Sequence, residues 1–219
     1  RRVLFRSAQV YGWMFFGLLT TGIVAYYTAN SPALLNLIFG SKITFYAFLF
    51  APIVLVMIIS SKINSLSANM ASFLFFVYSA VTGVTLSAIF LVYTQDSIAT
   101  TFGITAGTFG ATALFGYVTK KDLSKMGSIL FMLLIGLIIA SVVNMFLKSD
   151  TMMWVLTYAG IVIFVGLTAY DMQKLKKIAH SIDEDESSIA KFAVLGALTL
   201  YLDFINLFLR LLQIFGKKR

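Results

Sequence analysis

The stretch MGSILFMLLIGLIIASVVNMFL, residues 126–147, lies between Lys125 and Lys148 and contains no charged residue. Its 22 residues exceed the ~20 that an α-helix needs to cross the hydrocarbon core of a bilayer. Lipid offers no hydrogen-bond partners to backbone N–H and C=O groups, so a stretch of this kind must satisfy them within a helix. The sequence therefore predicts a membrane-spanning helix at 127–147.

Five other intervals between charged residues have the same character, with 35, 19, 33, 23 and 20 uncharged residues. Each interval is long enough for one crossing helix, and none comfortably holds two. A seventh apolar region has only 11 uncharged residues between Lys191 and Asp203, so we expect a helix that its neighbours bury. The predicted fold class is an all-α membrane protein, a seven-helix transmembrane bundle in a single multi-pass domain over residues 1–219. The predicted spans are 10–28, 43–60, 71–93, 97–118, 127–147, 152–170 and 192–215.

The composition excludes a soluble domain. Of the 219 residues, 59% are hydrophobic and only 12% are charged, and the mean hydropathy is +0.91. Soluble domains carry about 25% charged residues. The absence of cysteine and the single histidine, His180, exclude disulfides, thiolate sites and multi-histidine metal centres. The sequence also lacks the motifs of a phosphate-binding loop, a serine hydrolase and a zinc protease, so we expect neither an enzyme nor a cofactor.

The basic residues behind the net charge of +8 are scattered among the loops. This pattern indicates membrane topology and contact with anionic lipid, and no nucleic-acid partner. With a cytoplasmic N-terminus, eleven lysines and arginines lie inside and only Lys42 and Lys148 lie outside, so we predict that orientation. The basic tail, residues 217–219, leaves two alternatives. A full seventh crossing places it outside, and a re-entrant last helix keeps it inside.

Three ionisable residues lie within or at the edge of the spans: Asp171, Asp203 and Arg210. An ionised side chain in a span costs roughly 2.5–3.5 kcal/mol, so each one requires a partner or a function. A polar stripe of helical spacing consists of Asp203, Asn206, Arg210 and Gln213. This stripe must face the interior of the bundle or a wet cavity. Asp203 and Arg210 are about 10 Å apart along the helix axis, too far to neutralise each other directly.

Asp171, at the end of the sixth predicted span, has two interpretations. It forms an interfacial ion pair with Lys174, or it meets Asp203 of the antiparallel seventh helix; Asp203 itself has the alternative of a structural hydrogen bond. Two carboxyl groups in contact at low dielectric cannot both stay ionised cheaply, so they would share a proton. Such a pair can latch two helices together, and its oxygens are the hard ligands that calcium prefers. A pH-gated cation path follows as a hypothesis.

Four motifs, taken together and in this order, resemble the Bax inhibitor-1 family, whose members are also called transmembrane Bax inhibitor motif proteins. They are SAVTGVTL at 79–86, TKKDLS at 119–124, AYD at 169–171 and YLDFINLF at 201–208. The likeness runs from about residue 71 to the C-terminus, and the first two spans match only in hydropathy. The short length and the absence of cysteine are most similar to the bacterial branch, which implies an inner (cell) membrane location.

The resemblance implies a seven-helix fold with a central last helix and a pH-sensitive calcium leak. It implies that Asp171 and Asp203 form the sensing gate, and both are candidate calcium ligands. We expect Asn206 and Arg210 to line or support the path. Some bacterial members place an arginine after the second span, near the latch. In this sequence Lys62 stands in that stretch, and we expect it to support the latch. Lysine is a point charge and cannot form the two parallel hydrogen bonds that an arginine can form.

Two functions from different classes remain open. The first is the calcium leak channel, with the calcium ion and the lipid bilayer as partners. The alternative is a regulatory membrane protein that binds membrane proteases or stress and cell-death factors, in which the buried acids are structural. An intramembrane aspartyl protease is disfavoured, because its G-x-G-D motif is missing before Asp203.

Overall fold

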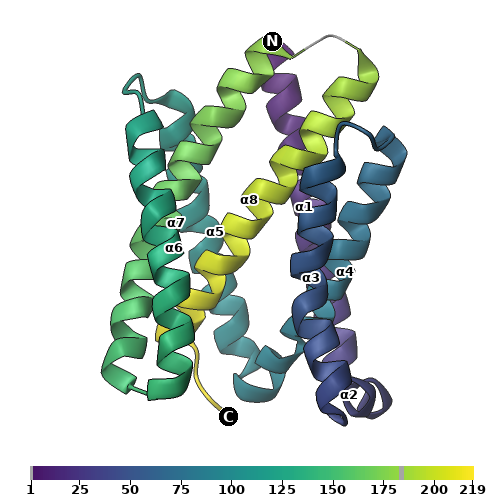
Figure 1. Cartoon of the computed structure of the whole chain (residues 1–219), viewed down its shortest axis with the longest axis vertical. Helices are drawn as coiled ribbons and strands as arrows, with labels where there is room; N and C mark the ends of the chain where they lie inside the picture. Colours follow the sequence, from purple (N-terminus) through teal and green to yellow (C-terminus); the bar gives the residue numbers. More distant parts are fainter. Residues whose placement is uncertain (1, 183–184) are drawn as a thin grey trace. The chain divides into compact units, whose positions relative to one another are not determined.

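The computed structural model describes residues 2–182 and 185–219, so Arg1, Asp183 and Glu184 lie outside the described residues. Within the described part, every named secondary-structure element is an α-helix (Figure 1). Seven of these helices are long and apolar enough to cross a membrane by length and composition, which confirms the predicted all-α membrane fold. They are α1 (Arg2–Ala29), α3 (Lys42–Lys62), α4 (Ala68–Val92), α5 (Gln95–Val118), α6 (Ser124–Leu147), α7 (Asp150–Ser181) and α8 (Glu186–Phe215).

The chain divides into two compact units, and α8 contributes to both. The first unit contains residues 2–94, the end of α7, the first half of α8 up to Tyr201, and residues 218–219. The second contains residues 95–178 and the second half of α8, residues 202–217. Of the 18 residues in the most apolar stretch of α8, 67% are buried, a larger share than in the other candidate spans of the described residues. The last helix is therefore buried by its neighbours, as its interrupted hydropathy predicts.

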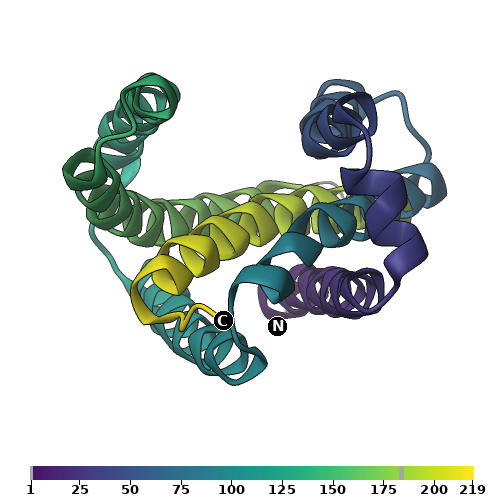
Figure 2. The ribbon, with the colours of Figure 1, turned by 90° about the horizontal axis from the view of Figure 1, so that it is seen from below.

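A short helix that the hydropathy pattern does not predict, α2 (Pro32–Phe39), follows α1. Ser31 caps it, because its side-chain oxygen accepts a hydrogen bond from the backbone N–H of Leu34. Pro32 stands in the first turn, where the missing N–H costs no intrahelical hydrogen bond. Helix α2 packs against α1 and α3 (Figure 2).

Helix α7 extends well beyond the predicted span 152–170. It continues to Ser181 without interruption, because no glycine or proline stands in residues 171–181 and its polar residues can form helix outside the lipid. The expectation that Asp171 lies at a helix end is therefore wrong. Asp171 lies in the body of α7, with ten helical residues after it.

In the first unit, α1 and α4 approach each other closely. A Cβ added to Gly83 of α4 would lie 2.6 Å from the backbone oxygen of Thr21 on α1, so only glycine fits there. The hydroxyl of Thr21 donates to the carbonyl of Ser79 at 2.8 Å. Tyr201 of α8 joins this contact, since its hydroxyl hydrogen-bonds to that of Thr21 and its ring packs edge-on against Tyr78.

Arg6 of α1 is buried, with 6% of its surface exposed. Its guanidinium donates to the carbonyl of Ala179 at 2.6 Å and to that of Ile182 at 3.4 Å. Ala179 stands in the last turn of α7 and Ile182 follows the helix. Carbonyl groups at a helix C-terminus generally lack intrahelical partners, and a cation there complements the helix dipole. Arg6 therefore joins α1 to the end of α7. The sequence does not predict this contact, because Arg6 resembles the other basic residues that set the orientation in the membrane.

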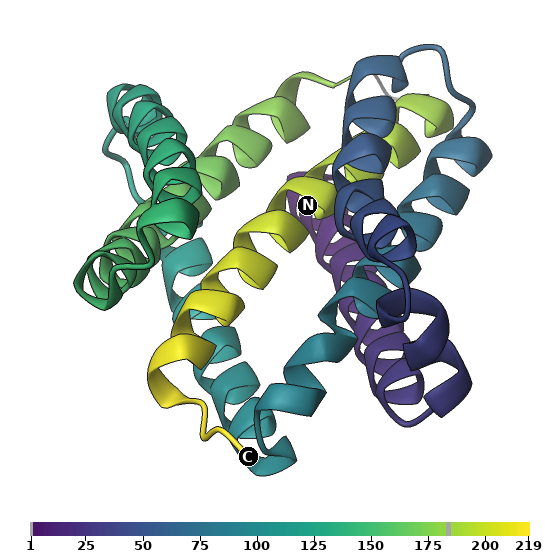
Figure 3. The same ribbon diagram turned by 60° about the horizontal axis from the view of Figure 1, so that its bottom comes forward.

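The C-terminal tail supports one of the two alternatives for the last helix. The N–H of Arg219 donates to the carbonyl of Val92 at 2.9 Å, and Lys218 pairs with Tyr93 at the end of α4 (Figure 3). Three crossings, by α1, α3 and α4, put the end of α4 on the opposite side from the N-terminus. A tail at that place requires a full crossing by α8, whose 30 residues reach ~45 Å.

We predict that Gly83→Ala lowers the thermal stability of the protein, because the added methyl group forces α1 away from α4. A cost of ~1–3 kcal/mol corresponds to a fall in Tm of roughly 2–12 °C. Thermal unfolding in detergent, followed by tryptophan fluorescence, measures it. Gly22→Ala on α1 is the control, since its Cβ would meet nothing within 4 Å. Equal Tm values for the two variants would contradict the packing described for α1 and α4.

Candidate functional site

Asp171 of α7 and Asp203 of α8 face each other in the second unit. Their side chains interact as a hydrogen-bonding pair. Asp203 is buried, with 5% of its surface exposed, and Asp171 is half-buried. The charge of Lys174, three residues further along α7, acts on Asp171 as well. The structure thus brings together the two acids that the sequence singles out.

The Asp203 carboxyl has an incomplete set of partners. Its Oδ2 atom is buried and has no hydrogen-bond partner among the described residues. Two ionised carboxylates are acceptors only, so their hydrogen bond requires one proton on the pair. No group of three or more histidine, aspartate or glutamate residues in the described part of the chain could hold a metal ion. Two carboxyl groups fall short of the about six to eight oxygens that enclose a resident calcium ion.

The polar stripe of α8 runs antiparallel along α7. Eleven residues before Asp171, Gly160 leaves room for Arg210, whose Nε atom would lie 3.0 Å from an added Cβ. One turn further, the hydroxyl of Thr157 donates to Oε1 of Gln213 at 2.6 Å. Arg210 makes no ion pair with a described carboxylate, as its distance from Asp203 along the helix predicts. Asp203, Arg210 and Gln213 of the stripe therefore face α7.

Two other predicted residues have separate surroundings. Asn206 donates its side-chain N–H to the carbonyl of Leu202 in its own helix, at 2.8 Å. Lys62 is exposed at the end of α3 and belongs to the first unit. The expected roles of Asn206 and Arg210 in the path, and of Lys62 in the latch, stay predictions.

Glycines fit α5 and α6 tightly against the turn of α7 that carries Asp171. A Cβ on Gly116 of α5 would overlap the carbonyl of Ala169, and one on Gly127 of α6 would overlap the ring of Tyr170. Contacts of this kind let helix backbones approach closely in a membrane. The two residues that precede Asp171, Ala169 and Tyr170, therefore each pack against a glycine of a neighbouring helix. A larger residue would not fit at either glycine.

The loop between α5 and α6 is fastened to α7 two residues after Asp171. Gln173 accepts the backbone N–H of Leu123 at 2.9 Å and donates to the carbonyl of Lys121 at 2.8 Å. Both Gln173 and Leu123 are buried. One glutamine thus satisfies two backbone groups of the loop at the start of α6, where helix N–H groups lack intrahelical partners.

Two lysines continue the same face of α7. Lys176 donates to the carbonyl of Tyr117 at 2.7 Å and lies 4.6 Å above the ring of that residue. Lys177 forms an ion pair with Asp122 at 3.1 Å. Gln173, Lys176 and Lys177 stand at i, i+3 and i+4, the spacing of one helix face. The sequence does not predict these contacts, because the predicted span ends at residue 170 and the lysines have the pattern of loop charges.

Comparisons with known proteins show the family of the chain. The family described as Inhibitor of apoptosis-promoting Bax1 matches residues 2–219. The chain belongs to the Bax inhibitor-1 family. It is 56% identical over 213 residues to a protein of Escherichia coli named inner membrane protein YbhL, covering 97% of this chain and 91% of that one. It is 48% identical to an uncharacterized protein of Borreliella burgdorferi and 42% identical to one of Rickettsia prowazekii, over 97% and 96% of this chain and 91% and 89% of theirs.

In this family member, the TKKDLS motif at 119–124 is the loop that Gln173 and Lys177 hold. Asp122 lies two residues before the start of α6, and its carboxylate accepts hydrogen bonds from the hydroxyl and the N–H of Ser124, the first residue of that helix. The hydrogen bond from the Ser124 hydroxyl, followed by that from Lys177, lowers the pKa of Asp122 to about 2. With a lowered pKa, the carboxylate and its contacts persist as pH falls and are lost only near pH 2. The loop therefore keeps its hold on α7 throughout the neutral range.

We predict that Gln173→Ala releases the α5–α6 loop, because it leaves the Leu123 N–H and the Lys121 carbonyl without their partner. At ~1–3 kcal/mol for such groups, the Leu123 amide should exchange with deuterium roughly five- to hundredfold faster. Hydrogen exchange resolved by mass spectrometry over residues 119–126 measures this. Lys125→Ala, an exposed change in the same segment, is the control. Exchange at the same rate in Gln173→Ala and the wild type would show that the contact does not hold the loop.

Proposed function

We propose that this Bax inhibitor-1 family protein is a pH-sensitive calcium leak channel and that the Asp171–Asp203 pair is its gate. The observation that carries the proposal is the contact between the two carboxyl groups, with a buried Asp203 oxygen that no described residue partners. An ionisable pair within a membrane-spanning bundle points to ion or proton passage. The proposed activity is transport across the membrane and not catalysis.

The proton of the pair supplies the switch. With one proton, a carboxyl group of one helix donates to the carboxylate of the other and α7 stays attached to α8. With no proton, two negative charges repel each other; with two protons, the charge-assisted hydrogen bond is lost. Because a bond of this kind contributes ~1.5–3 kcal/mol, its loss shifts a two-state latch by roughly ten- to hundredfold.

The other two polar residues of the stripe in this part of α8, Asn206 and Arg210, suit a path through which ions pass slowly. Ionised carboxylates of the opened pair are hard oxygen ligands for a passing calcium ion, and Asn206 adds a polar group on the next turn of α8. Arg210 adds a positive charge about 10 Å further along the helix. This charge opposes a high local concentration of cations, so Asn206 and Arg210 fit a slow leak better than a wide pore.

The location follows from the relatives and the charges. The Escherichia coli relative is named an inner membrane protein, and we propose the same multi-pass location for this chain. The excess of lysine and arginine in the loops on the N-terminal side favours a cytoplasmic N-terminus. With seven crossings, this orientation exposes Asp171 and the α5–α6 loop to the cytosolic side, where the gate would sense cytosolic pH.

We predict that Asp171→Asn and Asp203→Asn remove the pH dependence of calcium flux into proteoliposomes. An asparagine amide donates to the remaining carboxylate whatever the pH, so flux should stay at the lowest level of the wild type between pH 5 and 8. In Asp171→Ala and Asp203→Ala, which have no donor, flux should be pH-independent and roughly ten- to hundredfold higher. A calcium-sensitive dye inside the liposomes measures all five proteins.

Two matched controls separate the gate from other titrating groups. Asp122→Asn removes a carboxyl group whose pKa is about 2, and His180→Gln removes the only histidine; both should keep the pH dependence of the wild type. Wild-type pH profiles in all the Asp171 and Asp203 variants would refute the gate. Flux no greater than that of empty liposomes would refute the channel and favour the regulatory alternative, in which the protein binds other membrane proteins.

A further inference from the structure

Tyr201 of α8 stands two residues before Asp203 and is fully buried in the first unit. Its hydroxyl hydrogen-bonds to that of Thr21 on α1, and the Thr21 hydroxyl donates to the backbone carbonyl of Ser79 on α4 at 2.8 Å. A threonine hydroxyl has one proton, and a carbonyl oxygen can only accept. Tyr201 is therefore the donor to Thr21, and the three groups form a directed chain from α8 through α1 to α4.

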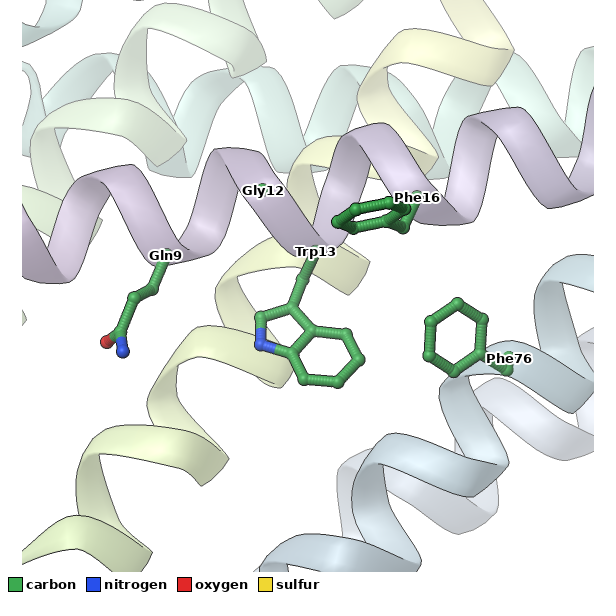
Figure 4. A pocket seen from close by; sticks show the side chains of 5 residues that line it. All are labelled: Gln9, Gly12, Trp13, Phe16 and Phe76. Carbon is green, nitrogen blue, oxygen red and sulfur yellow. The ribbon is translucent and has the colours of Figure 1, made fainter.

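The ring of Tyr201 also has fixed surroundings. It packs edge-on against Phe75 and Tyr78 of α4, with ring centroids 6.2 and 5.4 Å apart. The indole of Trp13 on α1 packs against the same Phe75 with centroids 6.4 Å apart. It also packs against Phe76 with centroids 5.4 Å apart (Figure 4). Tyr201 therefore lies against a wall of aromatic side chains from α1 and α4, and it cannot turn without displacing them.

Tyr201 and Asp203 leave α8 in opposite directions. Two residues along an α-helix are about 3 Å apart along the axis and about 200° apart around it. Tyr201 is bound to Thr21, and Asp203 is paired with Asp171 of α7. The same turn of α8 therefore carries two attachments. The first consists of neutral hydroxyls that do not ionise near neutral pH, and the second depends on a proton.

Tyr201 can act on the pair through position and not through charge. Among the described residues, the charges that act on Asp171 and Asp203 are that of Lys174 on α7 and those of the two acids themselves. Arg210, the other charged residue in this half of α8, lies about 10 Å along the helix. The contacts of α5 and α6 with this part of α7 are made by glycines, which carry no charge. Any effect of Tyr201 on the pair must therefore come from where it holds α8.

We propose that Tyr201, through its hydrogen bond to Thr21, is a positioning residue for the aspartate gate. It holds α8 so that the Asp203 carboxyl stays within reach of Asp171, which favours the closed, one-proton state of the pair. This inference rests on the proposed function, since it concerns the regulation of the same gate. Without the Tyr201 hydroxyl, the closed state becomes roughly two- to tenfold less favoured, as expected for the loss of one buried hydrogen bond.

The positioning role has a signature in the pH profile. The closed state requires one proton on the pair, so it has an acidic limit, where a second proton binds, and an alkaline limit, where the first is lost. When the closed state is less favoured, the open states replace it earlier on both sides. A tenfold change in an equilibrium that involves one proton equals one pH unit, so a two- to tenfold change moves each limit inward by about 0.3–1 pH unit.

Tyr201→Phe tests this role, because it removes the hydroxyl and keeps the ring. Calcium flux into proteoliposomes between pH 5 and 8 should show a narrower pH range of low leak, with a minimum roughly two- to tenfold higher than in the wild type. Thr21→Val removes the same hydrogen bond and should narrow the range at least as much. The variant with both substitutions should not exceed Thr21→Val, because the bond between the two residues is already lost.

Two matched substitutions on α1 are the controls. Tyr26→Phe removes the hydroxyl of an exposed tyrosine. Thr20→Val removes a hydroxyl that donates to the carbonyl of Phe16 in its own helix. Both variants should keep the pH range of the wild type.

Infrared spectra of the protein with carbon-13-labelled aspartate separate this role from the channel, because they follow the proton of the pair whether or not calcium passes. The pH range of the one-proton state should narrow by the same amount in Tyr201→Phe. A wild type without calcium leak but with this narrowing would refute the channel and support the positioning role. A wild-type pH range in Tyr201→Phe would overturn the positioning role and leave the gate intact, even if Tm falls, since a residue that only supports the fold changes Tm alone. A wild type without any one-proton state would overturn both.

Discussion

The proposed function depends on one contact, that between the carboxyl groups of Asp171 and Asp203 inside an apolar bundle. Asp203 stands on the most buried of the spanning helices, where a lone carboxylate would be costly. Its partner is another acid, Asp171, so the pair is stable only when it holds a proton. A salt bridge at this place would be insensitive to pH over a wide range. In the mechanism that we propose, a pair of carboxyl groups makes the attachment of α7 to α8 depend on the proton concentration around them.

The surrounding residues hold α7 in place and leave the pair as its variable contact. Gly116 and Gly127 admit α5 and α6 against the residues just before Asp171, and Gln173 fastens the α5–α6 loop just after it. Further along the two helices, the hydrogen bond between Thr157 and Gln213 joins α7 and α8 at a distance from the aspartate pair. Since packed helices shift between discrete arrangements rather than deforming continuously, a proton at one contact can select between two states.

The sequence predicts those features of the fold that follow from the cost of placing a charged side chain in the hydrocarbon core of a membrane. That rule alone predicts the seven spans and the buried last helix, and it singles out Asp171 and Asp203. Their contact with each other is one of two interpretations that the rule leaves open. It cannot locate contacts that depend on which neighbour a polar group finds. The continuation of α7 past Asp171 and the short helix α2 follow from local capping and helix propensity, which hydropathy does not record. Arg6 and Gln173 resemble ordinary interfacial residues in the sequence, because their partners are backbone groups of distant segments.

The most direct test of the central claim asks whether Asp171 and Asp203 share a proton. Infrared spectra of the protein in lipid, with aspartate labelled by carbon-13, distinguish protonated from ionised carboxyl groups. At the pH where the proposed calcium leak is smallest, we predict one protonated aspartate whose signal disappears in Asp171→Asn and also in Asp203→Asn. A spectrum without a protonated aspartate at that pH, or a signal that survives either substitution, would contradict it.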